Sequence, residues 1–163
     1  MPGQKLQVIR GLNNCRQQHQ NGEITIGNFD GLHLGHQKML EKMHSEASRL
    51  NTHSCLMTFE PLPREYFSRD EASSSRLMSR IEKIRTLGDF EDSLRPDYLL
   101  FLKFDRSLAA MSAVEFIEQV LVKSLRIRAV IVGDDFRFGC DRKGDFDLLS
   151  DYGDKYGFSV SSI

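Results

Sequence analysis

The stretch that decides the fold reads EITIGNFDGLHLGH and occupies residues 23–36. Its first four residues include three that are β-branched, and Gly27 ends this run, which is typical of a short strand. The apolar residues that follow the stretch recur at helical spacing: Met39, Leu40, Met43, Ala47 and Leu50. The sequence therefore predicts a strand, a loop with three glycines and then an amphipathic helix.

The same alternation continues along the chain. Further strands are expected at Ser54–Phe59, Tyr98–Leu102, Ala129–Val132 and Phe158–Ile163. Further helices are expected at Arg76–Leu87, from Ser112 onward and at Asp145–Tyr156, and Ser112 with Glu115 forms a capping-box pattern. Residues 71–75, with three serines, are expected to form an exposed loop. Strands that alternate with helices predict an α/β fold, a mostly parallel sheet with helices on both faces.

The composition describes an ordinary globular chain. Of its 163 residues, 40% are hydrophobic and 28% are charged, so one domain with a real core is expected. The formal net charge of −1 provides no basic field for nucleic acid or an anionic membrane, and neither is expected as a partner. Any phosphate binding must therefore come from local geometry.

The cysteines and the N-terminus indicate the compartment. Cys15, Cys55 and Cys140 are far apart and form no C-x-x-C pair, which argues against disulfides or a zinc site. Residues 1–10 contain no apolar core of a signal peptide, and no apolar run is long enough to span a bilayer. A cytoplasmic protein is expected, while its oligomeric state is left open.

The loop after the first quoted strand is the strongest candidate site. It fits neither G-x-G-x-x-G nor the P-loop pattern, but it places His33 and His36 at the start of a helix. A helix N-terminus with nearby glycines binds phosphate through free N–H groups. The alternatives are an ordinary surface pair of histidines, or metal ligands, although no third ligand lies nearby in sequence. The flanking Gly-Asn-Phe-Asp-Gly favours a functional site.

Three motifs in this order resemble one family. Residues 25–36 resemble the H-x-G-H signature of nucleotidyltransferases, in the form used by bacterial bifunctional riboflavin kinase/FMN adenylyltransferases. Residues 58–67 resemble the F-x-P-x-P segment of that family, and residues 132–139 resemble its G-x-[DN]-F-x-F-G segment, which Arg142–Asp145 continues. The resemblance runs from about Val8 to the end of the chain. It implies a Rossmann-like nucleotidyltransferase fold and adenylyl transfer from ATP to FMN, giving FAD.

The resemblance also implies roles for individual residues. Those expected to hold the ATP phosphates are Gly27, Phe29, Asp30, His33, Gly35 and His36, with Asp135 near the ribose and phosphates. His33 and His36 are expected to stabilise charge on the α-phosphate as pyrophosphate leaves. No general base is required, because the FMN phosphate is already an anionic nucleophile. A magnesium ion is expected as counter-charge between the two polyanions.

Aromatic and proline residues are expected on the flavin side. The resemblance implies that Pro61, Pro63 and Phe67 flank the isoalloxazine ring, with Phe116 and Phe138 as further wall candidates. For Phe116 core packing is favoured over flavin contact, because it shares a helical stripe with Ala113 and Val120.

The chain departs from the family pattern in two places. Leu62 stands where many members have histidine, and the chain stops before the I-S-S-T-x-x-R segment and the riboflavin kinase module. Residues 1–163 are thus expected to be one adenylyltransferase domain without its C-terminal end, binding nucleotide but forming little FAD. The alternatives are transfer to another phosphorylated acceptor, as in a cytidylyltransferase, and a nucleotide- or flavin-binding module with little turnover.

Overall fold

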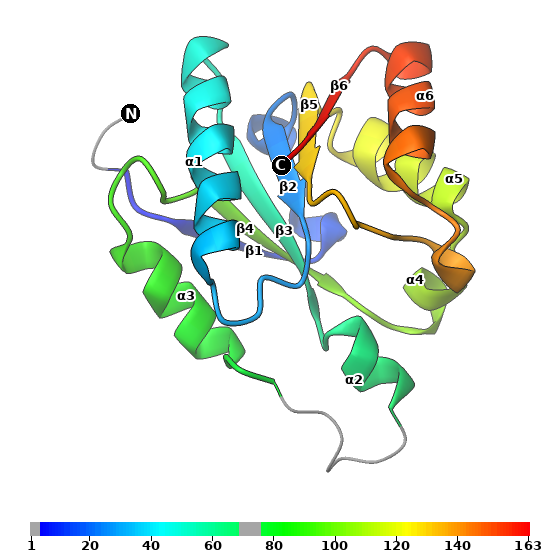
Figure 1. Ribbon diagram of the computed structural model, residues 1–163, viewed down its shortest axis with the longest axis horizontal. Helices are drawn as coiled ribbons and strands as arrows, with labels where there is room; N and C mark the ends of the chain where they lie inside the picture. The colour runs from blue at the N-terminus through cyan, green and yellow to red at the C-terminus, as the bar shows by residue number, and fades with distance from the viewer. Residues whose placement is uncertain (1–3, 69–75) are drawn as a thin grey trace.

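The structure, a computed structural model, describes residues 4–68 and 76–163, so the loop expected at residues 71–75 lies outside it. Within the described residues, six strands form one sheet, and every neighbouring pair is parallel. The strands are β1 (Gln7–Arg10), β2 (Glu23–Ile26), β3 (Ser54–Glu60), β4 (Tyr98–Lys103), β5 (Ala129–Val132) and β6 (Ser159–Ser162). Their spatial order is β1-β4-β3-β2-β5-β6 (Figure 1).

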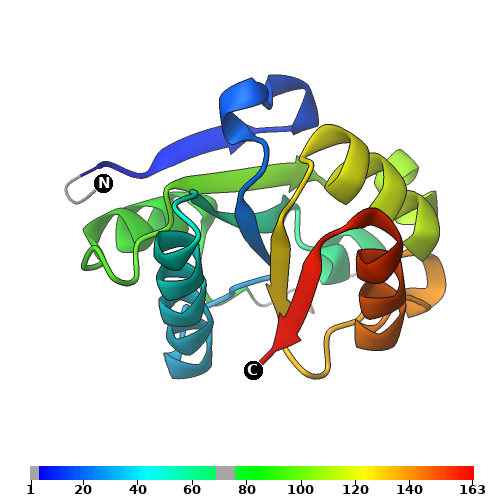
Figure 2. The same ribbon diagram turned by 90° about the horizontal axis from the view of Figure 1, so that it is seen from above.

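Helices cover both faces of this sheet, as Figures 1 and 2 show. On one face lie α1 (Leu34–Arg49) and α3 (Arg80–Asp89); on the other lie α5 (Ala113–Glu115), its π-helical continuation η4 (Phe116–Ser124) and α6 (Phe146–Tyr156). Two short helices, α2 (Pro63–Phe67) and α4 (Arg106–Ala110), follow β3 and β4. Single helical turns are η1 (Leu12–Asn14), η2 (Gln17–His19) and η5 (Cys140–Arg142). The α/β architecture expected from the sequence is confirmed.

The core is divided between the two faces because side chains alternate along each strand. Leu56, Leu99 and Ile131 pack with α1 and α3, in a cluster that includes Met39, Leu40, Met43 and Leu87. Their neighbours in sequence, such as Met57, Leu100 and Val130, pack on the opposite face with Ile117, Val120 and Leu149. Burial on both faces explains why these strands are almost continuously apolar.

Local capping signals set two helix starts, one where it was expected and one later. The Ser112 hydroxyl accepts the Glu115 backbone N–H at 3.0 Å, so the predicted N-terminus is confirmed. The helix expected to begin at Arg76 begins instead at Arg80, and this prediction was wrong by four residues. The reason is that Ser79 caps α3, accepting the Glu82 N–H at 3.1 Å, while the backbone just before it bonds elsewhere.

Strand ends at the centre of the sheet define where ligands are expected. From β2 the chain moves to β3 on one side, whereas β5 lies on the other, so the strand order reverses between β2 and β5. Open parallel sheets bind ligands at such a switch point, outside the carboxyl ends of the strands. The loops after Ile26 and Val132 flank this position.

A buried carboxyl lies at the other end of β2. Glu23 is 1% exposed, and neither of its carboxylate oxygens has a hydrogen-bond partner among the described residues. Burial raises the pKa of Glu23 to about 7, and the nearby Glu46 acts in the same direction. The folded state therefore holds this proton more tightly than the unfolded chain. Ionisation of Glu23 costs stability as the pH rises from about 4.5 to about 7.

Replacing Glu23 by glutamine is expected to remove this pH dependence. At pH 8 the free energy of unfolding of Glu23→Gln should exceed that of the parent by roughly 1–3 kcal/mol, with a smaller difference at pH 5. Urea denaturation at the two pH values measures it, with the exposed Glu41→Gln on α1 as the matched control. An equal change at both pH values would contradict a titrating buried carboxyl.

Candidate active site

The two histidines lie together at the start of α1. His33 is the N-cap residue, α1 begins at Leu34, and the two imidazole rings stack with centroids 3.6 Å apart. Gly35 makes room for this stack, since a Cβ atom there would lie 3.1 Å from Cε1 of His33. Both histidines lie at a helix start, as expected from the sequence, and their stacking places the two rings on the same side of it. The free N–H groups of this helix turn lie beside them.

The two rings differ in surroundings. His33 is exposed, whereas His36 is half-buried and packs against Phe29 with ring centroids 4.8 Å apart. Burial lowers the pKa of His36 to about 4, and His33 and Lys83 act in the same direction. His36 is therefore an uncharged imidazole at neutral pH, which donates one N–H. Its buried Nδ1 has no hydrogen-bond partner among the described side chains and backbone groups.

Asp30 and Phe29 hold the loop in place. The Asp30 carboxylate accepts the backbone N–H groups of Leu77 and Met78, both at 2.9 Å, and pairs with Arg64. Burial alone would raise the pKa of Asp30, but these bonds lower it below its ordinary value. Phe29 is 2% exposed and belongs to the core beneath α1. Both side chains thus support the loop, so any contact with ATP at Phe29 falls to its backbone.

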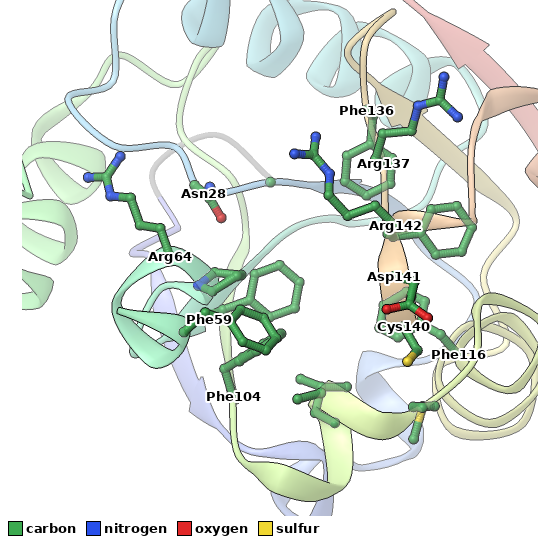
Figure 3. A pocket seen from close by; sticks show the side chains of 18 of the residues that line it. Asn28, Phe59, Arg64, Phe104, Phe116, Phe136, Arg137, Cys140, Asp141 and Arg142 are labelled. Atoms are coloured by element: carbon green, nitrogen blue, oxygen red, sulfur yellow. The ribbon is translucent and has the colours of Figure 1, made fainter. Parts of the chain in front are cut away.

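A cavity of about 560 Å³ opens beside the loop, at the carboxyl ends of β2, β3, β4 and β5 (Figure 3). The loop after β2 contributes Gly27 and Asn28. The other lining residues are Phe59 of β3, three residues after β3 (Pro63, Arg64, Phe67), five after β4 (Phe104, Leu108, Ala109, Met111, Phe116) and residues 135–142 after β5. This volume is within the ordinary range for small-molecule sites.

Aromatic rings form two walls of this cavity. On one side, Phe104 meets Phe59 and Phe67, each with ring centroids 5.8 Å apart. On the other, Phe138 stacks with Phe136 at 5.5 Å and contacts Phe116 at 5.7 Å. Figure 3 shows the two groups facing each other across the space. Such walls suit a flat, apolar ring.

Arginines surround the same opening. In Figure 3 the guanidinium group of Arg64 lies on the α2 side, and those of Arg137 and Arg142 lie on the opposite side. Arg137 also pairs with Asp145 at 3.4 Å. Guanidinium groups bind phosphate through paired N–H donors. A cavity with aromatic walls and guanidinium groups at its edge, beside Asp135 and Asp141, can take a ligand that is both aromatic and anionic.

Four of the five residues predicted to contact the flavin line the cavity, and one does not. Pro63, Phe67, Phe116 and Phe138 all line the cavity, as does Asp135 from the predicted nucleotide set. Pro61, by contrast, does not line it; its bond to Glu60 is cis. Phe116 is 4% exposed and packs in the core, as favoured from the sequence, while its ring also reaches the cavity wall. Leu62 is buried at 1% exposure.

Several lining residues were missed from the sequence. Phe104, Leu108 and Met111 follow β4, whose end was not considered as a ligand site, although the rule for strand ends applies there equally. Arg64 follows Pro63 and precedes the aromatic residues of α2, and no sequence pattern indicated it as a ligand residue. Convergence in space, rather than a motif, identifies these residues.

Metal-binding groups are sparse in this region. Across residues 4–68 and 76–163, no three His, Cys, Asp or Glu side chains gather closely enough to hold an ion by themselves. In the same residues, no helix is both long and apolar enough to cross a bilayer. Magnesium that arrives with a polyphosphate needs only one or two protein carboxylates. Asp135 is a suitable carboxylate on the cavity.

Comparison with known proteins gives consistent relatives. The family profile described as FAD synthetase matches residues 15–163. The bifunctional riboflavin kinase/FMN adenylyltransferase of Escherichia coli (strain K12) is 44% identical over 158 residues, 96% of this chain and 49% of that protein. The protein of the same name from Pseudomonas fluorescens is 41% identical over 157 residues, with the same coverage. The chain therefore spans about half the length of the curated relatives it matches.

A solved structure also shares the fold. The structure titled "Crystal Structure of Macrolide-efflux Protein from Streptococcus pneumoniae" aligns with a TM-score of 0.79, covering 97% of this chain and 50% of that one. The sequence identity is 21%, so this likeness supports the architecture alone.

Proposed function

Because the chain belongs to the FAD synthetase family, we propose that its site joins the adenylyl group of ATP to the phosphate of FMN, giving FAD and pyrophosphate. We further propose that residues 1–163 act as one domain for this reaction, in the cytoplasm. The three cysteines, which are free thiols, agree with a reducing compartment.

One observation carries the proposal: the start of α1, with its glycine-containing loop, and an aromatic cavity adjoin at the same switch point. The loop that ends in His33 and His36 begins with Gly27 and Asn28, which line the cavity. ATP phosphates at the helix start and a flavin between the aromatic walls would therefore meet near this loop. The reaction requires such a meeting, because rate enhancement in nucleotidyl transfer comes mainly from positioning and electrostatic stabilisation.

The proposed step is a displacement at phosphorus. A phosphate oxygen of FMN forms a bond to the α-phosphorus of ATP, and the bond from that phosphorus to the bridging oxygen of pyrophosphate breaks. The electron pair leaves with pyrophosphate, so no proton transfer to a general base is needed. His36, uncharged, donates an N–H to the developing charge, while His33 and the N–H groups of α1 hold the phosphates.

Magnesium is part of the proposal. When bound, it would neutralise charge between the two substrates and help orient the α-phosphate. Asp135, which lines the cavity just after β5, would hold it together with substrate oxygens.

The test is direct. The protein is incubated with ATP, FMN and magnesium, and FAD and pyrophosphate are measured together; parallel reactions replace ATP with CTP or FMN with other phosphorylated acceptors. FAD formed in step with pyrophosphate supports the proposal. Transfer to a different acceptor would favour another nucleotidyltransferase activity, and binding of ATP and FMN without product would favour a binding module.

Phe67 provides a prediction specific to the flavin. Its ring is 65% exposed on the cavity wall, where a bound isoalloxazine would cover it. Phe67→Ala is expected to raise the Kd for FMN about 5- to 20-fold, roughly 1–2 kcal/mol, because apolar contact is lost. The Kd for ATP should stay within about twofold.

Calorimetric titration of both ligands measures this difference. Ile81→Ala is a matched control, since Ile81 is 64% exposed on α3 and does not line the cavity. Equal weakening of ATP and FMN by Phe67→Ala would point to collapse of α2 rather than loss of a flavin contact.

A further inference from the structure

A lysine is enclosed beneath the loop that joins the two halves of the site. Lys83 lies on α3 and is 3% exposed. Its ammonium group donates to the backbone carbonyl of Asn28 at 2.7 Å. The hydroxyl of Thr58, on β3 and fully buried, donates to the same carbonyl at 3.1 Å. One carbonyl of the cavity-lining loop is thus fixed by donors from two different elements.

Charged groups from several elements act on this ammonium. Burial lowers the pKa of Lys83 to about 8, and Arg76 acts in the same direction. Opposing them are Asp30 on the loop, Glu60 at the end of β3 and Glu65 on α2. The charge of Lys83 also reaches His36 on α1, whose pKa it helps to lower.

Packing alone does not account for a lysine here. Lys83 and Leu87 are the two buried residues of α3, one helical turn apart, and an apolar residue would fill the first position at a lower cost of desolvation. Lysine differs from such a residue in its donors and its charge. The donors act on the Gly27–His36 loop through the hydrogen bond to the Asn28 carbonyl. The charge acts on the same loop through its effect on the pKa of His36.

We propose that Lys83 is a positioning residue, which fixes the Asn28 turn between the ATP phosphates and the flavin cavity and sets the electrostatic environment of His36. The proposal rests on the function proposed above and adds a residue that touches neither substrate. Because the ammonium acts from below, its effect reaches ATP through the loop backbone and His36 rather than by direct contact.

The first measurement needs no ligand. Lys83→Met removes the charge and the donors while keeping an unbranched chain, and nuclear magnetic resonance follows the titration of His36. The pKa of His36 is expected to rise in this variant, because one nearby positive charge is gone. Arg85→Met, which removes an exposed positive charge from the same helix, should leave it unchanged.

The second measurement uses ATP with magnesium, titrated calorimetrically at pH 7 and pH 9. Lys83→Met is expected to weaken ATP binding about tenfold at pH 7, the scale for one charged hydrogen bond. The wild-type chain should lose affinity on going to pH 9 as Lys83 loses its proton. Lys83→Arg, which keeps its charge at pH 9, should not show this loss.

The two measurements test the role of Lys83 separately from the proposed function. An unchanged pKa of His36 and unchanged ATP affinity in Lys83→Met would overturn the positioning role, as would equal wild-type affinity at the two pH values. If the wild-type chain binds no ATP, the proposed function fails. The histidine titration then still decides the role of Lys83, because it requires no ligand.

Discussion

Replacing His36 by alanine is expected to slow FAD formation about 30- to 1,000-fold, equivalent to roughly 2–4 kcal/mol of transition-state stabilisation by analogy with the loss of one oxyanion donor. The ring stands at the start of α1, stacked on His33 and supported by Phe29. Its low pKa keeps it uncharged, and the neutral imidazole still has one N–H to donate as negative charge develops during transfer. Steady-state measurement of kcat with saturating ATP, FMN and magnesium, in a full-length version that forms FAD at a measurable rate, gives the effect.

The control for this variant is a histidine on the same helix. His44→Ala lies two turns further along α1, away from the loop, and is expected to retain the parent rate. Thermal unfolding of both variants separates catalysis from stability. A His36→Ala protein that turns over normally would remove His36 from the mechanism, and one that unfolds would make it a structural residue.

Gly139→Ala is expected to have the largest effect on stability. Gly139 has φ 79° and ψ 172°, a region that residues with a Cβ atom avoid. An added Cβ would lie 2.6 Å from the backbone N and Cα of Ala113, neither of which is a flexible side-chain end. Backbone strain and overpacking together should lower the free energy of unfolding by about 2–5 kcal/mol.

Gly139→Ala should also alter the shape of the cavity. Gly139 lines it and directly follows Phe138 of the aromatic wall, so FMN affinity should fall with stability. Urea denaturation and FMN titration measure the two effects. Gly88→Ala on α3 is the matched control: nothing lies within 4 Å of the added Cβ, and alanine favours helix there. Unchanged stability of Gly139→Ala would contradict the close approach to Ala113.

The central strands and the helix start at Ser112 were predictable from the sequence because their signals are local. β2 and β5 have the predicted bounds, and Ser112 caps its helix as expected, since periodicity and capping act within a few residues. The edge strand β1 was missed. Only Ile9 of its four residues is buried, so it lacks the apolar run of a central strand, and its pairing with β4 decides its conformation.

The motifs also identified the Gly27–His36 loop, and four of the five residues predicted to contact the flavin line the cavity. They could not assign tasks within the loop. Asp30 is engaged by Leu77 and Met78, almost fifty positions away in sequence, and no local pattern predicts such a bond. The later start of α3 has the same origin, because that backbone bonds to Asp30 before the helix begins.

By itself, the sequence determined the α/β alternation, the glycine-containing loop before α1 and the histidine pair. Only the tertiary structure decided which side chains surround the cavity, that His36 is uncharged and that Lys83 is enclosed beneath Asn28. The physical reason is range. Strand and helix periodicity follow from neighbouring residues, whereas desolvation, electrostatic fields and cavity walls depend on groups that the parallel sheet brings together from distant strand ends.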